Sequence, residues 1–264
     1  MSEDQGEPRN SISKIATALG SLLGGDYAPA AVVGEDAAAQ RDRLNHRLVN
    51  FGMRRQRNIE SVAAAAFDFA EFRSSEDGGD APIDEDWLAR FVKHVEDVSN
   101  PLMQEIWGQV LAVEASTPGS FGLGTLNTLA VMSADDTEIW AKARRIAFLS
   151  GFLLKIGARQ DFGPFGVGAA DIARLRAIGL LTETDDMSVT YMAPTKGLTL
   201  EFIGANLIVR HPESTLFTFP GIRITQSGID LLRNLPSAEV DQKYLTGLGD
   251  SFKERGFDYR IRAV

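Results

Sequence analysis

The helical character of the chain is decided by residues 84–120, which read DEDWLARFVKHVEDVSNPLMQEIWGQVLAVEASTPGS. Asp84 can accept hydrogen bonds from the free amides of a helix start, and Asn100-Pro101 places proline at the first position of a second helix. Apolar residues recur every three or four positions in both segments, and Thr117-Pro118-Gly119 ends the second. Because the connection between the two helices is short, the stretch predicts an antiparallel helical bundle.

A much longer helix is predicted before this pair, over residues 36–72, which contain no proline. At 1.5 Å per residue it would span about 55 Å. Its apolar positions alternate at spacings of four and three, which is a heptad seam interrupted by Arg55 and Asn58. One small bundle could not bury so long a seam. The pattern therefore predicts a homo-oligomer whose interface contains Leu44, Leu48, Phe51, Arg55, Asn58 and Val62.

The first 35 residues are expected to be flexible and to carry one amphipathic helix. Ile12, Ile15, Leu19 and Leu22 form its apolar stripe. A helix that lies on a membrane surface usually carries several lysines or arginines, and this one has only Lys14. We expect it to dock on a neighbouring subunit or on the helical domain, and a membrane-acting effector is the alternative.

The composition of the sequence changes after Gly151, where residues 152–168 are rich in glycine and aromatic residues. We place a domain boundary there. A helix over residues 169–178 precedes four predicted short strands at 188–192, 198–202, 207–210 and 216–219. This order predicts a small winged-helix-like α+β domain over residues 151–264. The expected fold is therefore mainly α, with a flexible N-terminus (residues 1–35), a helical domain (36–150) and this C-terminal domain.

The charge balance argues against a nucleic-acid partner. The whole chain carries a formal net charge of -9, whereas DNA affinity rests largely on phosphate neutralisation. The predicted winged helix offers only Arg174 and Arg176 as possible nucleic-acid contacts, with Asp171 beside them. A DNA-binding regulator is kept as an alternative function.

No catalytic, metal or cofactor site can be assembled from the sequence. The chain has no cysteine, so disulfides and thiolate chemistry are excluded. The histidines are His46, His94 and His211, and their spacing does not match that of metal ligands. The glycine-rich stretch 163–168 lacks the Lys-Ser/Thr of a phosphate-binding loop. We predict a protein that is not an enzyme, and a polar, acidic start without a secretory signal predicts a cytoplasmic location.

Two segments together resemble the bacterial family catalogued as domain of unknown function 2806. One is residues 54–61, and the other carries the motif residues Trp87, Gln104, Trp107, Glu114, Pro118, Gly119, Ser120 and Phe121. The Met-Gln-x-x-Trp pattern at 103–107 is also similar to the helical part of abortive-infection alpha proteins, a bacterial anti-phage family. The first resemblance implies organisation and no assigned activity. We expect a scaffold or sensor that assembles with copies of itself and acts in phage defence. A further protein partner is also expected as a possibility of this function.

Overall fold

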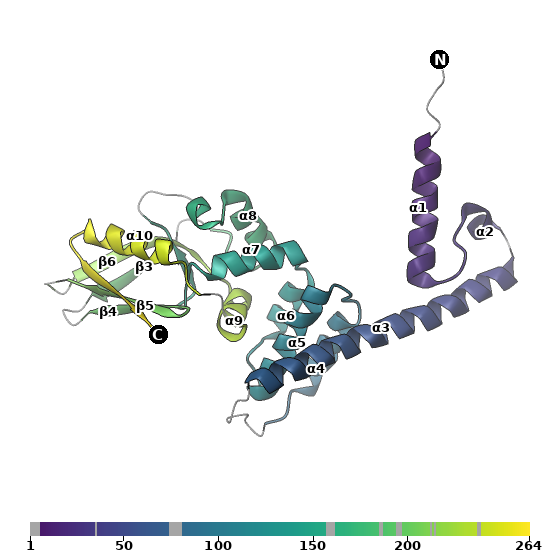
Figure 1. The fold of residues 1–264 in the computed structure, drawn as a ribbon, viewed down its shortest axis with the longest axis horizontal. Coiled ribbons are helices and arrows are strands. Elements are labelled where there is room, and N and C mark those ends of the chain that lie inside the picture. The colour runs from purple at the N-terminus through teal and green to yellow at the C-terminus, as the bar shows by residue number, and fades with distance from the viewer. Residues whose placement is uncertain are drawn as a thin grey trace, which may run out of the picture.

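The structure is a computed structural model that describes residues 6–34, 36–73, 81–156, 162–184, 187–193, 197–211, 213, 215–236 and 239–264. It contains a helical arm, a helical domain and a twisted sheet with its own helices (Figure 1). The predicted flexibility of residues 1–5 lies outside this part of the chain. No described helix is both long and apolar enough to cross a membrane.

The helical arm consists of α1 (Gly6–Leu23), α2 (Pro29–Val33) and the first part of α3 (Ala37–Arg73). The chain turns after α1 at Gly24 and Gly25, whose φ angles are 73° and 92°. These positive φ angles favour glycine, and a Cβ atom at Gly24 would also meet the side-chain amide of Asn50 on α3. The principal contact of α1 is with α3, and its first turns project away from the rest of the molecule (Figure 1).

The helical domain packs the second part of α3 against α4 (Glu85–Val95), α5 (Pro101–Ser116), α6 (Leu123–Ala130) and α7 (Ala134–Arg144). Asp84 accepts a hydrogen bond from the Trp87 amide, so the predicted cap is confirmed. The second helix begins at Pro101 as predicted, and the Asn100 side chain accepts a hydrogen bond from the Met103 amide. The largest helix–helix contact is that between α3 and α5. At Gly108 of α5 the missing side chain lets the backbone lie close to Ala65 and Ala66 of α3.

The second half of the chain forms a seven-stranded antiparallel sheet in the order β3-β6-β2-β1-β4-β5-β7. The strands are β1 (Ala147–Phe148), β2 (Phe152–Leu154), β3 (Met187–Ala193), β4 (Leu198–Phe202), β5 (Ala205–Arg210), β6 (Thr215–Arg223) and β7 (Asp258–Ala263). The helical elements of this half are η1 (Gly163–Phe165), α8 (Ala169–Ala177), α9 (Gln226–Asn234) and α10 (Gln242–Lys253).

Helix α10 lies against the sheet through its buried side chains Tyr244, Leu248 and Phe252. The Tyr244 hydroxyl donates to the carbonyl of Leu154 on β2 over 2.7 Å. Burial raises the pKa of this phenol far above its ordinary value, so it stays protonated and holds the helix on the sheet.

The prediction of a mainly α fold with a small winged-helix-like domain is wrong, because the sheet is too large and the fold is mixed α+β. The predicted strands at 198–202 and 207–210 do pair as a hairpin. However, β1 and β2 insert between this hairpin and β6, and β7 pairs with β5 at the other side. A winged helix has neither of these additions. The short β1 and β2 have only two and three residues, which is too few for a periodic signal.

The helical domain and the sheet region share one continuous hydrophobic core. Polar contacts reinforce this joint on the surface of α9. Asp230 accepts hydrogen bonds from the Thr125 hydroxyl (2.6 Å) and the Gly122 amide (3.2 Å), and the Asn234 amide donates to the Ser120 carbonyl (3.0 Å). The arm alone therefore stands outside the shared core.

Candidate functional site

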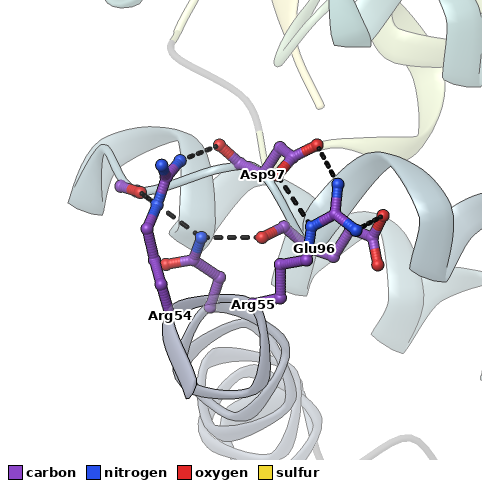
Figure 2. A network of polar contacts seen from close by, with 6 residues as sticks. Arg54, Arg55, Glu96 and Asp97 are labelled. Atoms are coloured by element: carbon purple, nitrogen blue, oxygen red, sulfur yellow. Dashed lines mark hydrogen bonds and ion pairs between the residues drawn. The ribbon is translucent and has the colours of Figure 1, made fainter. Parts of the chain in front are cut away.

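The base of the arm is the point where α3 enters the helical domain, and it is held by a polar network (Figure 2). The Arg55 guanidinium donates through Nε and Nη2 to the two carboxylate oxygens of Asp97, over 3.2 and 3.3 Å. Its Nη1 lies 3.3 Å from a carboxylate oxygen of Glu96. The same guanidinium stacks 4.6 Å from the centroid of the Phe51 ring. Arg55 therefore links the turn after α4 to the first exposed part of α3.

Neighbouring side chains hold the backbone of the same turn. Arg54 donates through Nη2 to the Asp97 carbonyl and through Nε to the Ser99 hydroxyl, each over 3.3 Å. Asn58, which is only 6% exposed, donates to the Glu96 carbonyl over 2.8 Å. A buried amide with several partners fixes geometry more strongly than an exposed ion pair does. This network, which we call the arm latch, sets the direction in which α3 leaves the helical domain.

The predicted interface residues fall into three environments. Leu44 and Leu48 are 43% and 60% exposed, whereas Val62 is 1% exposed and belongs to the core. Arg55 and Asn58 contact the α4–α5 turn of their own chain. Their role in a contact between two copies stays a prediction. The apolar seam is therefore buried in the core near the end of α3 and exposed to solvent near its start.

Two hollows lie on the arm and are not evident in the sequence. The first, which we call the arm groove, has a volume of about 490 Å³ and is lined by Leu23, Arg47, Leu48, Phe51, Gly52 and Arg55. The second has a volume of about 410 Å³ and is lined by Tyr27, Val32, Gln40, Arg41, Arg43, Leu44 and Arg47. Apolar and arginine side chains line both hollows. They exist because α1 and α2 fold back on α3. Local sequence patterns do not predict this arrangement.

The family-motif residues form the inside of the helical domain. The buried Glu114 carboxylate accepts hydrogen bonds from the Gly119 amide (2.6 Å) and the Phe121 amide (3.0 Å). The Trp87 indole donates to the Phe121 carbonyl over 2.8 Å. Pro118 and Ser120 complete the loop that these contacts hold, and Ser120 also donates its hydroxyl to the Thr117 carbonyl. The motif therefore shapes the loop between α5 and α6 and contacts no hollow on the arm.

Gln104 and Trp107 extend this internal framework toward α3 and α4. The Gln104 amide donates to the Val98 carbonyl over 2.9 Å and to the Asn58 side chain over 3.4 Å, so it joins the arm latch. Trp107 is fully buried and stacks on His94, with a distance of 5.8 Å between the ring centroids. Both side chains act in packing and positioning within the described fold.

The two arginines proposed as nucleic-acid contacts have partners in their own chain. Arg174 on α8 donates to both carboxylate oxygens of the buried Asp136, over 2.5 and 2.7 Å. This contact holds the pKa of Asp136 well below its usual range. Arg176 donates through Nε to the Thr182 carbonyl over 3.0 Å. Contact of either arginine with a nucleic acid stays a prediction.

Among the residues with described placement, no group of three or more carboxylate and histidine side chains could hold a metal ion. Comparisons with curated proteins and with solved structures each found no match. The model of one protein family, described as Protein of unknown function (DUF2806), matches residues 42–249. This range contains the latch, the motif loop and most of the sheet, but not α1 or α2. Since the match covers well over half of the sequence, the chain belongs to the DUF2806 family.

Proposed function

We propose that the protein is a non-enzymatic scaffold that assembles with copies of itself through the helical arm. The observation that carries this proposal is the apolar surface of the arm. Ten of the nineteen large hydrophobic side chains exposed in the described part of the chain lie between residues 12 and 53. Contiguous exposed apolar surface on a protein of this size marks an interaction site. The arm therefore needs a partner that buries it.

The partner that fits best is a second copy of the same chain. Residues 41–57 contain six arginines and a single acidic residue, Asp42, whereas Glu3, Asp4 and Glu7 lie at the start of the sequence. In the structure, the beginning of α1 lies away from α3 of its own chain (Figure 1). We infer from charge alone that the acidic start of one copy meets the basic arm groove of another. Charge complementarity of this kind sets orientation and speeds association.

The arm latch supports assembly because it limits the freedom of the arm. Arg54, Arg55 and Asn58 hold the α4–α5 turn, so the exposed part of α3 leaves the domain in a defined direction. An interface element that is already ordered loses less conformational entropy when it binds. The latch thus favours association without taking part in chemistry.

The experiment compares two single substitutions of equal charge on the same helix. Leu48→Asp places a carboxylate in the arm groove, and Phe67→Asp places one at a position that is 70% exposed and outside the groove. Sedimentation velocity of the full chain should show a shift toward the monomer for Leu48→Asp and no shift for Phe67→Asp. Equal behaviour of both variants would exclude the arm groove as the interface.

Two other functions make different predictions for the same arm. Binding to DNA or to an anionic membrane would use its arginines, and the affinity would fall steeply with salt. We expect mobility-shift and liposome-flotation assays of the full chain to stay at background. A salt-sensitive complex that Leu48→Asp leaves unchanged and that loss of Arg47 abolishes would replace the scaffold proposal. The anti-phage setting rests on the resemblance at residues 103–107 alone and stays a hypothesis.

A further inference from the structure

The second hollow of the arm combines positive charge with an aromatic side chain. It lies where the loop after α1 and the helix α2 approach the beginning of α3 (Figure 1). Its volume of about 410 Å³ is within the range of small-molecule pockets, about 300–1,000 Å³. Tyr27 and Val32 line it from the loop and from α2. The side formed by α3 consists of Gln40, Arg41, Arg43, Leu44 and Arg47. We call it the arginine hollow.

Two of its arginines lie one helical turn apart. Arg43 and Arg47 are four residues apart on α3, so their side chains lie on the same face of the helix. Like charges at this spacing repel each other and weaken a helix. In the described part of the chain, none of the three arginines of the hollow forms an ion pair. An anion that binds between them would remove the repulsion.

The carboxylates that neighbour the hollow in the sequence have other partners. Asp26 and Asp36 accept hydrogen bonds from backbone amides two residues further along the chain, over 2.8 and 2.9 Å. Asp42 lies between two of the arginines in the sequence, but its carboxylate is 3.5 Å from Nδ1 of His46. These three acidic side chains therefore leave the positive charge of the hollow available to a ligand.

The side chains of the hollow differ in how firmly they are held. A Cβ atom at Gly25 would lie 3.5 Å from the Cγ atom of Arg43, so the turn after α1 passes close to the stem of this arginine. Arg43 and Tyr27 are half-buried, whereas Arg41 and Arg47 are exposed. A side chain that is already packed loses less freedom when it binds a ligand. Arg43 is therefore the principal cation of the hollow, and the exposed arginines supplement it.

We propose that the arginine hollow binds a free mononucleotide. A guanidinium offers paired N–H donors that match the oxygens of a phosphate group, and Tyr27 offers an aromatic face on which a base stacks. The net charge of -9 disfavours an extended polyanion such as DNA, whereas a single hollow of this size accommodates one nucleotide. The proposal is independent of self-assembly, because Tyr27 and Arg43 do not line the arm groove.

The test is equilibrium dialysis of the full chain against AMP, adenosine and inorganic phosphate at constant ionic strength. We expect AMP to saturate one site per chain, and adenosine and phosphate each to bind about tenfold more weakly or less, because each lacks part of the contacts. GMP, CMP and UMP should bind with similar affinity to AMP, since every base has a stacking face. Inorganic phosphate that binds as tightly as AMP would contradict a nucleotide site, and so would the absence of saturable binding for all four nucleotides. Tighter binding of a short single-stranded oligoadenylate than of AMP would assign the hollow to nucleic acid instead.

Substitutions locate the site. Arg43→Gln should weaken AMP binding about tenfold or more. Arg57→Gln is the matched control, because Arg57 is exposed on the same helix and lines neither hollow. Tyr27→Leu should weaken AMP binding about fivefold or more and leave the binding of inorganic phosphate unchanged. Equal losses in Arg43→Gln and Arg57→Gln would show a general charge effect and overturn the proposal. The wild-type comparison of AMP with adenosine and phosphate decides the question even if a variant fails to fold.

Discussion

The close crossing of α3 and α5 determines where the arm leaves the molecule, and Gly108→Ala tests it. A Cβ atom at residue 108 would lie 2.6 Å from the Cβ of Ala65 and 2.9 Å from backbone atoms of Ala65 and Ala66. Carbon atoms in good contact are about 3.5–4.0 Å apart, so the two helices would have to separate by about 1 Å. Because the obstacle is backbone, no side-chain rotation can relieve it.

The expected loss of stability follows from two opposing effects. Overpacking of a well-packed core costs about 1–3 kcal/mol, and the contact with backbone places this site at the upper end. Alanine is favoured over glycine inside a helix by about 1 kcal/mol. The net loss is therefore about 2 kcal/mol. For a domain of 150–250 residues this lowers the melting temperature by about 4–8 °C.

Gly52→Ala is the matched control on the same pair of helices. Gly52 lies in α3, and no atom would lie within 4 Å of its added Cβ. This substitution should raise stability by about 0.4–1 kcal/mol, because it restricts the unfolded chain without a clash. Thermal unfolding followed by circular dichroism measures both variants. If Gly108→Ala were as stable as Gly52→Ala, α3 and α5 would not cross at this distance.

Three further substitutions and one control variant test other parts of the account. Glu114→Gln replaces one acceptor of the motif loop by a donor and should cost about 2–4 kcal/mol, whereas Glu105→Gln on the exposed face of α5 should change little in denaturant titrations. Trp107→Ala should cost about 3–5 kcal/mol, and an unchanged melting temperature would show that this tryptophan is not core. Arg174 lowers the pKa of Asp136 in the folded state, so the ionised carboxylate stabilises the fold. This contribution to the free energy of unfolding is fully present above about pH 5 and is lost on acidification below the ordinary carboxyl pKa near 4. Asp136→Asn should therefore flatten the fall of stability in that acid range.

The helical half of the fold could be predicted from the sequence because its signals are local. The cap at Asp84 and the helix start at Pro101 occur where the short-range patterns place them, and the long helix ends at Arg73, one residue beyond the predicted end. Helix caps and apolar periodicity are set by residues a few positions apart. Such features need no knowledge of the rest of the chain.

The sheet could not be predicted because its pairing is non-local. Phe152 on β2 pairs with Arg223 on β6, and Ala205 on β5 pairs with Ala263 on β7. The residues that flank each of these strands do not indicate which distant strand it pairs with. The hairpin of β4 and β5 can be predicted because its strands are adjacent in the sequence. The error in fold class follows from this difference.

The candidate site shows the same limit in a different form. Leu48 and Val62 lie on one heptad seam, yet Leu48 is open to solvent and Val62 is buried against the rest of the domain. The periodicity of the sequence reports that a face is apolar, but not what covers it. The change of partner occurs at Arg55 and Asn58, which interrupted the seam and in the structure form the arm latch.

The central claim, assembly through the arm, is tested most directly by the molar mass of the full chain in light scattering across the micromolar range. The chain has a mass of 28.7 kDa. We expect a mass that is a multiple of this value and that falls toward it on dilution, and a chain without residues 1–35 should be closer to the monomer at each concentration. A constant mass of 28.7 kDa for the full chain at every concentration would contradict the account.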